Sequence, residues 1–393
     1  MRIIRNFILI FLMLFMMQNC VVIKESSFNQ DKYLNLGPNN TKIYELKHEN
    51  AFIPIMRLTP HSNVSGIFTK LLLVEFNNHP EYYMIELQEV KDRELLGMIV
   101  LLYAHKNEIV DIYYTNDLIL RKEEYESLLN KVTIQKTDFQ ANMELTPSGI
   151  NAYLLMTDKY GKPIELSIKE NRKEVNTKGL LAPIGSGSSS PEKFPFIYLK
   201  GFSLIKQRNT NISLKIDGKS CDISKIPAFV NFEKVYNAKY SFDNFLLDIN
   251  RNTDTLLLSQ KVSQNKTEIN YESWNYFFKH NNVFLEISSI NTRIDNKELS
   301  IFFAPAIPDL LNLKENIDLS GKFAIQLDDI KAILGGFYTV KTAYTGDITF
   351  EMNFEKGWQP MPGKLWMKNY KWVCNLQKEG DTYREVSYWL KTK

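Results

Sequence analysis

Hydrophobic and polar residues alternate along much of this chain, so that the dominant period is two residues. The clearest case is 348–355 (ITFEMNFE), and 323–328 (FAIQLD) repeats the alternation. Two shorter segments behave alike, 164–168 (IELSI) and 212–216 (ISLKI), and the hairpin-turn pair Asp217–Gly218 follows the second. A period of two is typical of a β-strand that turns one face to a core and the other to water.

Further strand-like segments are spread over the whole chain, with polar turns between them. They are 70–76, 82–90, 95–103, 109–114, 196–204, 255–262, 283–290, 365–373 and 383–390. Short strands at this density predict an all-β fold, an antiparallel sandwich or barrel-like structure arranged as two β lobes.

Helical periodicity is confined to two places. Tyr125, Leu128, Leu129 and Val132 follow the i, i+3, i+4, i+7 spacing of one helix face, which predicts two or three turns. The segment 308–313 (PDLLNL) has room for one further turn. The expected fold is therefore β-rich with one or two short helices.

One segment breaks the strand pattern, 182–195 (APIGSGSSSPEKFP), with three prolines, two glycines and four serines. Such a composition cannot sit inside a regular element. A Gly/Ser stretch can also cradle a phosphate, but this one lacks the G-x-x-x-x-G-K-[ST] pattern of a P-loop. We therefore predict a linker between an N-terminal β-rich domain at 41–181 and a C-terminal β-rich domain at 196–393, since 393 residues exceed one typical core.

The N-terminal end has the zones of an export signal. Arg2 and Arg5 precede an unbroken apolar run at 7–17 (FILIFLMLFMM), and Cys20 follows shortly after. The basic start favours the cytoplasmic side of a membrane. The apolar run matches the core of a signal peptide and is too short for a mature spanning helix, which needs about 20 residues. We expect residues 1–19 to be a signal peptide.

A cysteine placed directly after such a core resembles the lipobox of bacterial lipoproteins, although 17–19 (MQN) departs from the Leu and small residues usual there. The resemblance implies cleavage before Cys20, acylation of Cys20 and a polar tether at 20–40. It implies an exported protein anchored in a membrane. Val21, which is not acidic, favours the outer membrane by analogy with enteric sorting, facing the periplasm or the surface. An uncleaved signal anchor or a plain secretory signal is the alternative.

Composition narrows the range of partners. Hydrophobic residues make up 44% of the chain and aromatic residues 12%, enough for real cores. The formal net charge is only +3, whereas nucleic acids and anionic membrane surfaces select for clustered Lys and Arg. We therefore expect no nucleic-acid partner, and a membrane contact made through acylated Cys20. The ligand or protein partner is left open.

The chain has three cysteines. If Cys20 is lipidated, Cys221 and Cys374 remain, and an oxidising compartment would permit a disulfide between them. Two separate buried thiols are the alternative, because cysteine is readily buried as a small apolar residue. No C-x-x-C or H-x-x-x-H spacing occurs, so neither a metal nor a cofactor is predicted.

Aromatic residues gather near the C-terminal end, where four of the five tryptophans lie. Trp366, Tyr370 and Trp372 share strand parity and are candidates for an exposed face that contacts a ligand, such as a sugar ring or a lipid. The alternative is that they form the core of the C-terminal sheet, where aromatic residues are expected.

No catalytic signature surrounds any histidine. The five are His48, His61, His79, His105 and His280, and we interpret His79 and His105 as solvated loop residues. The favoured function is an envelope-anchored lipoprotein that binds a ligand or partner or serves a structural role. The alternative is an enzyme of two-lobed lipocalin-like type, acting on an apolar substrate in a β-lined cavity, which rests on fold-level analogy alone.

Overall fold

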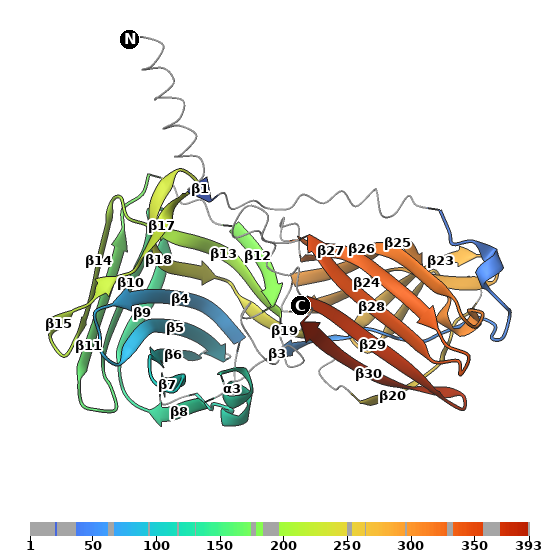
Figure 1. Ribbon diagram of the computed structural model, residues 1–393, viewed down its shortest axis with the longest axis horizontal. Coiled ribbons are helices and arrows are strands. Elements are labelled where there is room, and N and C mark those ends of the chain that lie inside the picture. The colour runs from blue at the N-terminus through green and yellow to red at the C-terminus, as the bar shows by residue number, and fades with distance from the viewer. Residues whose placement is uncertain are drawn as a thin grey trace, which may run out of the picture.

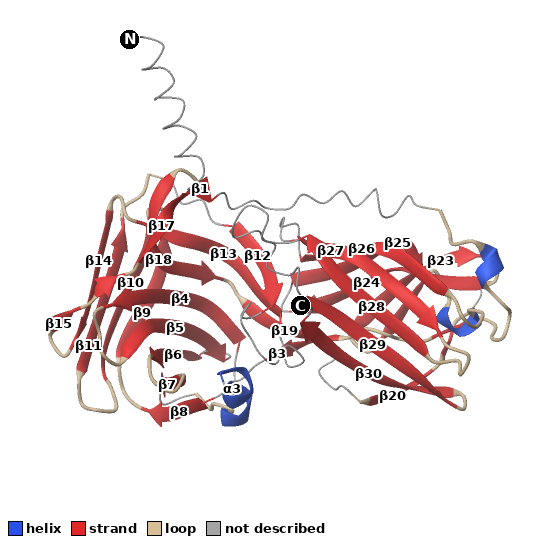
Figure 2. Ribbon diagram, viewed as in Figure 1, coloured by secondary structure: helices blue, strands red, loops and turns tan. Residues whose placement is uncertain are grey.

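The computed structural model of this protein consists of two β lobes that lie side by side (Figure 1). Strands dominate both lobes, as Figure 2 shows, which confirms the all-β fold expected from the period-two pattern. The residues that the structure describes are 20–21, 37–61, 67–92, 95–115, 118–129, 131–173, 178–183, 196–249, 254–263, 265–294, 297–327, 333–356 and 370–391.

The first lobe contains a 13-stranded sheet whose main path runs β3-β19-β13-β18-β4-β5-β6-β7-β8. Its strands pair antiparallel apart from β1–β17 and β7–β8, which are parallel. The strands are β1 (Cys20–Val21), β3 (Leu58–His61), β4 (Ile67–Asn77), β5 (Tyr82–Asp92), β6 (Leu95–Ala104), β7 (Ile109–Tyr114), β8 (Lys131–Lys136), β12 (Lys178–Pro183), β13 (Phe196–Lys206), β16 (Asp222–Ile223), β17 (Lys225–Val230), β18 (Glu233–Phe242) and β19 (Phe245–Ile249).

A five-stranded antiparallel sheet of order β15-β14-β11-β10-β9 completes the first lobe. Its strands are β9 (Gln140–Thr146), β10 (Gly149–Thr157), β11 (Pro163–Glu170), β14 (Thr210–Ile216) and β15 (Lys219–Ser220). One apolar core joins the two sheets, because Leu72 and Leu87 of the larger sheet belong to the same buried cluster as Leu154 and Leu166 of the smaller one. The smaller sheet thus has one buried face and one face in solvent.

The second lobe is a single antiparallel sheet of ten strands. They are β20 (Thr255–Leu258), β22 (Glu268–Tyr271), β23 (Trp274–Asn281), β24 (Phe284–Ile294), β25 (Lys297–Ile307), β26 (Asp318–Leu327), β27 (Ile333–Thr342), β28 (Ile348–Lys356), β29 (Tyr370–Glu379) and β30 (Thr382–Lys391). Aromatic rings fill its core: Phe350 stacks on Tyr338 and meets Trp372 edge-on. Such ring pairs contribute beyond their buried area.

The segment before β3 is part of the second lobe's core. After η1 (Thr41–Ile43), Tyr44 forms a β-bridge with Leu313, and β2 (Ala51–Phe52) pairs with β21 (Gln260–Lys261). Residues from Phe52 to Met56 are buried in the same cluster as the aromatic rings of the sheet. The chain then returns to the first lobe at β3. The two lobes are therefore connected through 37–61 as well as at 249–255.

The predicted helices are present, with adjusted ends. α3 (Lys122–Leu129) contains Tyr125, and it stops before Val132, which lies in β8. The helix is the crossover between β7 and β8, which are parallel and could not be joined by a tight turn. The turn predicted at 308–313 is η3 (Leu310–Asn312).

Strand pairing divides the chain at a different place from the predicted linker. β12 and β13 flank that segment and pair with each other, with Leu180 opposite Leu199, and β18 pairs with β4. Residues 184–195 lie outside the described residues. Sheet membership changes instead between β19 and β20. A Gly/Ser/Pro stretch can connect neighbouring strands as well as separate domains, so its composition alone does not mark a domain boundary. The division into folding units at 182–195 stays a prediction.

Candidate functional site

The solvent face of the five-stranded sheet exposes two large apolar side chains. In β10, Ala152, Leu154 and Met156 point into the core, whereas Tyr153 and Leu155 alternate with them and are 44% and 47% exposed. Strand parity accounts for this placement, because successive side chains of a strand point to opposite faces. An exposed ring and an exposed leucine two residues apart form a small apolar strip.

Hydrogen-bonding side chains border the strip on both sides. In the register of the sheet, Leu155 lies opposite Gln140 of β9 and Glu165 of β11. Tyr153 lies opposite Asn142 and Ser167 in the same way. The face therefore offers apolar contact in the middle, with amides, a hydroxyl and a carboxylate at its edges.

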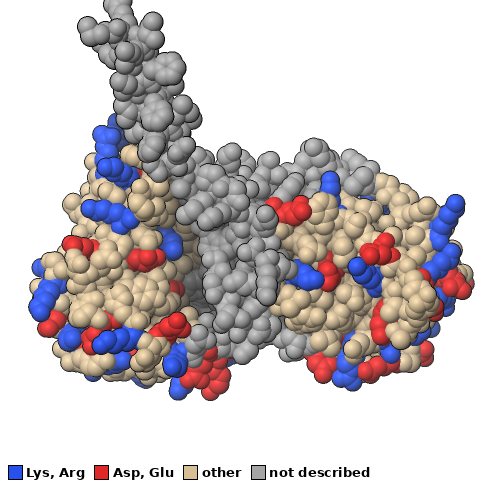
Figure 3. All heavy atoms as spheres, in the orientation of Figure 1, with Lys and Arg blue, Asp and Glu red and all other residues tan. Residues whose placement is uncertain are grey.

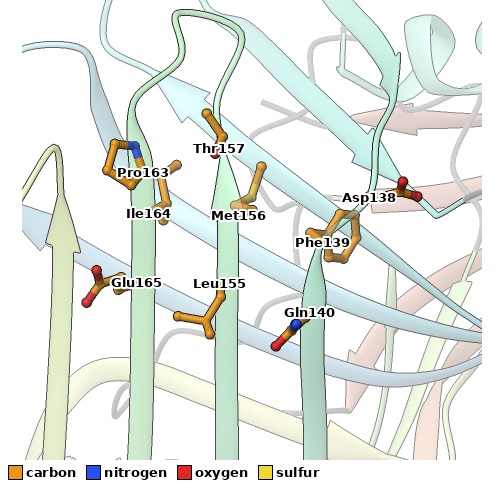
Figure 4. Close-up of a pocket in the computed structure, with 9 residues that line it drawn as sticks. All are labelled: Asp138, Phe139, Gln140, Leu155, Met156, Thr157, Pro163, Ile164 and Glu165. Carbon is orange, nitrogen blue, oxygen red and sulfur yellow. The ribbon is translucent and has the colours of Figure 1, made fainter.

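An open groove of about 460 Å³ lies at one end of this face. Figure 4 shows its lining side chains on the ends of β9, β10 and β11. The lining residues are Asp138, Phe139, Gln140, Leu155, Met156, Thr157, Pro163, Ile164 and Glu165. Its volume is within the range of small-molecule sites, about 300–1,000 Å³. We define the groove together with Tyr153 as the binding face.

The β10–β11 turn beside the groove is held by Asp158. Its Oδ1 accepts hydrogen bonds from the backbone N–H groups of Tyr160 and Lys162, both at 2.9 Å. The hydroxyl of Tyr82 in β5 lies 3.5 Å from Asp158 Oδ2 and 3.1 Å from Asp111 Oδ2. The turn therefore has a fixed shape and fixes the end of the groove.

Asp111 is the centre of the polar cluster under this turn, and it is almost fully buried. Its Oδ1 accepts hydrogen bonds from Lys159 Nζ at 2.8 Å and from the hydroxyl of Thr133. Burial is the largest single effect on the pKa of Lys159 and lowers it, but the hydrogen bond to Asp111, the charge of Asp111 and the contacts with Tyr160 together raise it, and the net shift is upward. A buried carboxylate paired in this way is a structural anchor and not a free base.

His79 is the histidine nearest to this cluster, and the structure gives it a packed position. Its ring stacks on Tyr82 at 5.6 Å, and its Nδ1 accepts a hydrogen bond from the Tyr82 backbone N–H at 3.1 Å. Burial lowers its pKa, so the neutral ring is favoured. His105, in contrast, is exposed. The interpretation of both as solvated loop residues holds for His105, whereas His79 lies in a loop as expected but is half-buried and packed on Tyr82.

The second lobe contains another polar group of interest. Cys374 Sγ lies 3.5 Å from Glu385 Oε1, and Arg57 Nη2 lies 3.8 Å from Glu385 Oε2. Arg57 Nη1 also lies 3.6 Å from Glu272 Oε1, and the Glu272 side chain is exposed. Burial raises the pKa of the Cys374 thiol well above its ordinary value, and the nearby Glu385 adds to the shift. A thiol held protonated is a poor nucleophile.

The possible disulfide between Cys221 and Cys374 is absent. Cys221 and Cys374 are both free and buried, the first in the core of the first lobe and the second in the core of the second. Of the two alternatives for this pair, separate buried thiols are therefore correct. The physical reason is that each cysteine fills a small apolar position in the core of a different lobe.

The three candidate aromatic residues differ in what the structure shows of them. Trp372 is fully buried in the second lobe's core, as the core alternative states. Trp366 lies outside the described residues, and of Tyr370 only the backbone is described, at the start of β29. Cys20 is described in its backbone as part of β1. Among the described residues, Tyr153 is an aromatic residue exposed on a sheet face, with Tyr83 and Phe337 less exposed on other strands, and sequence reasoning missed it.

Among the described residues, no cluster of three or more His, Cys, Asp or Glu side chains is arranged to hold a metal ion. Among the same residues, no helix combines the length and apolarity that crossing a membrane would need.

In comparisons with protein-family models, with curated proteins and with solved structures, nothing matches this chain.

Proposed function

We propose that the protein is an exported lipoprotein, anchored at the cell envelope through acylated Cys20, that binds a ligand or a protein partner on the binding face. The observation that carries the proposal of binding is the exposure of Tyr153 and Leu155 side by side with hydrogen-bonding groups, next to a groove. Such mixed surfaces are typical of recognition sites, where aromatic anchors supply contact area and polar neighbours supply specificity.

The chemistry of the binding face favours a ligand with both apolar and polar surface. Tyr153 and Leu155 offer contact to an apolar face, and Gln140, Asn142 and Glu165 offer hydrogen-bond acceptors and donors in the neighbouring strands. The groove is open along the sheet, which suits an extended molecule or a chain segment. A sugar chain, a lipid head with its chain, and a peptide all meet this description.

Binding is favoured over catalysis by the state of the polar groups. The buried carboxylate of Asp111 is paired with Lys159, and the Cys374 thiol has a raised pKa. Neither offers the activated nucleophile or free base that an enzyme acting in a β-lined cavity would need. In a structural role, the same exposed face would contact another component of an envelope assembly in place of a ligand.

The anchor is tested by replacing the lipidated residue. Cys20→Ser should move the protein from the membrane fraction to the soluble fraction, whereas Cys221→Ser should leave it in the membrane fraction. Mass spectrometry of native protein should show an acylated N-terminal cysteine. An unmodified Cys20 in the native protein would contradict the anchor.

The binding face is tested by photo-crosslinking in the cells that make the protein. A benzophenone amino acid at Leu155 should give defined adducts, and the same group at Val283, which is 48% exposed in the second lobe, should give few. Adding Tyr153→Ser should weaken the Leu155 adducts. Equal labelling at both positions, unaffected by Tyr153→Ser, would mean that this face is not the site.

A further inference from the structure

A hairpin tip beside the expected lipid anchor exposes an aromatic ring. β17 and β18 are joined by the turn Asn231–Phe232, and Phe232 is 76% exposed, among the highest values for large apolar residues in the described chain. β1 runs parallel to β17, with Cys20 opposite Phe229 and Val21 opposite Val230. Phe232 is three positions beyond Phe229, so their Cα atoms are at most about 10 Å apart. β1 and the β17–β18 hairpin thus lie at the same end of the first lobe (Figure 1).

The backbone of this turn favours a different residue. Both Asn231 and Phe232 have positive φ angles, 48° and 66°. Two-residue hairpins of this kind prefer Asn-Gly, because the left-handed conformation is unfavourable for a bulky side chain. The sequence places a phenylalanine where glycine would be more stable, and the ring then points into solvent. An unfavourable residue at an exposed position indicates a role outside the fold of this lobe.

Basic side chains surround the same tip. Lys234 is exposed on β18, and the backbone N–H of Gln207 donates to the Lys234 carbonyl, which brings the turn with exposed Arg208 alongside. The acidic residue of the tip, Glu233, is ion-paired with Lys206. Figure 3 shows Lys and Arg side chains gathered at this end of the lobe. This end of the first lobe is therefore locally basic, although the net charge of the whole chain is near zero.

We propose that the Phe232 hairpin is a membrane-docking tip, which inserts its ring into the interfacial region of the lipid bilayer that holds the Cys20 acyl chains. This inference rests on the proposed lipid anchor and adds a second contact to it. An aromatic ring with basic neighbours is the combination that the headgroup region of an anionic bilayer accepts. On this proposal the first lobe lies directly on the membrane, in contrast to the polar tether expected at 20–40, because Cys20 pairs with β17.

Depth-dependent quenching tests the tip in the protein as the cell makes it. The protein is purified from membranes and reconstituted into vesicles of phosphatidylethanolamine and phosphatidylglycerol, with or without bromine on the acyl chains. In Phe232→Trp, the fluorescence that the variant adds should be blue-shifted and mostly lost in brominated vesicles. Tyr344→Trp is the matched control, because Tyr344 is 77% exposed on a turn of the second lobe, and its added fluorescence should be unchanged.

The outcomes separate the tip from the anchor. Quenching in Phe232→Trp together with an unmodified Cys20 in mass spectrometry of the native protein would support the tip and contradict the lipid anchor. Release of Cys20→Ser without quenching in Phe232→Trp would support the anchor and overturn the tip. Equal quenching of Phe232→Trp and Tyr344→Trp would also overturn the tip, since the ring at 232 would then lie no deeper in the bilayer than a residue of the second lobe. Near-identical circular dichroism of both variants checks that the fold is retained.

Discussion

Cys374 and Glu385 form a thiol–carboxylate pair inside the second lobe, with Sγ 3.5 Å from Oε1. They lie on adjacent strands, since Cys374 is registered opposite Ser387, two residues beyond Glu385. Burial raises the pKa of Glu385 to about 7, against the opposing effects of Arg57 and the thiol. The carboxyl group therefore titrates near neutral pH although it is buried in a β-sheet core.

The raised pKa of Glu385 predicts that the protein loses stability as pH rises. Between the ordinary value of 4.5 and about 7, the folded state holds a proton that the unfolded state has released, so the free energy of unfolding falls over this window and levels off above it. The shift corresponds to roughly 3 kcal/mol. Asp309, whose pKa burial raises from 3.8 to about 6, adds a change of the same sign at lower pH.

Glu385→Gln removes the group that titrates. Urea unfolding of the variant should show a weaker decline between pH 4.5 and 7 than the parent protein, with the largest gain relative to the parent above pH 7. Glu165→Gln is the control, because Glu165 is exposed on β11 and should leave the pH dependence as it was. Parallel curves for Glu385→Gln and the parent would contradict the assignment.

A second prediction concerns the hydrogen bonds that hold the segment before β3 against the second lobe. Tyr44 donates a hydrogen bond to Glu286 Oε1 at 2.6 Å, and Asn281 Nδ2 donates to the same oxygen at 2.8 Å. Glu286 is fully buried, so a lost donor is not replaced by water. Tyr44→Phe should lower the free energy of unfolding by about 1–3 kcal/mol.

The control for this substitution is Tyr344→Phe, at a hydroxyl on an exposed side chain. It should change the unfolding midpoint little, since surface changes are usually within about 0.5 kcal/mol. If both variants shift the midpoint equally, the Tyr44–Glu286 bond does not hold the segment. We also expect faster proteolysis of 37–57 in Tyr44→Phe, because this segment would be held less firmly against the second lobe.

The strand pattern of the sequence predicted most of the fold because side-chain parity is a local property. The segment 109–114 is β7 without change, and 82–90 lies within β5. A strand without alternation was missed: β25 (KELSIFFAPAI) ends in the apolar run 301–307, whose successive side chains are buried on both sides of the strand. The segment 255–262 is divided into β20 and β21, which pair with different partners.

The site was harder to predict because it depends on which strands become neighbours. Tyr153 and Leu155 read as ordinary members of an apolar run (AYLLM), and only pairing with β9 and β11 shows that their face is in solvent. Every residue of AYLLM is apolar or aromatic, so the sequence does not mark which of its positions face inward. The proximity of Cys20 to Phe232 spans more than two hundred residues and leaves no trace in the sequence pattern.

A third prediction concerns close backbone packing at Gly336 in β27. A β-bulge places this residue against β28, and a Cβ added there would overlap the backbone carbonyl of Asn353. Backbone atoms in a paired strand cannot move aside without loss of sheet hydrogen bonds. Gly336→Ala should therefore cost more than about 3 kcal/mol or prevent folding of the second lobe.

Gly37→Ala is the matched control for crowding, because no atom lies within 4 Å of the Cβ that it would add. Thermal unfolding should be close to that of the parent protein in Gly37→Ala and strongly lowered in Gly336→Ala. Similar transition temperatures for Gly336→Ala and the parent would show that β27 can move away from β28.

The last prediction concerns the segment 182–195 and what a cut there does. Limited proteolysis should cleave first near 185–190, as its Gly and Ser content indicates. The two fragments should remain together in gel filtration and separate only in denaturant, because β12 pairs with β13 across the cut and β4 pairs with β18. Fragments that separate in native buffer would make 182–195 a boundary between independent units. Resistance of the segment to cleavage would mean that it is packed against the lobe, in which case its composition does not mark a linker.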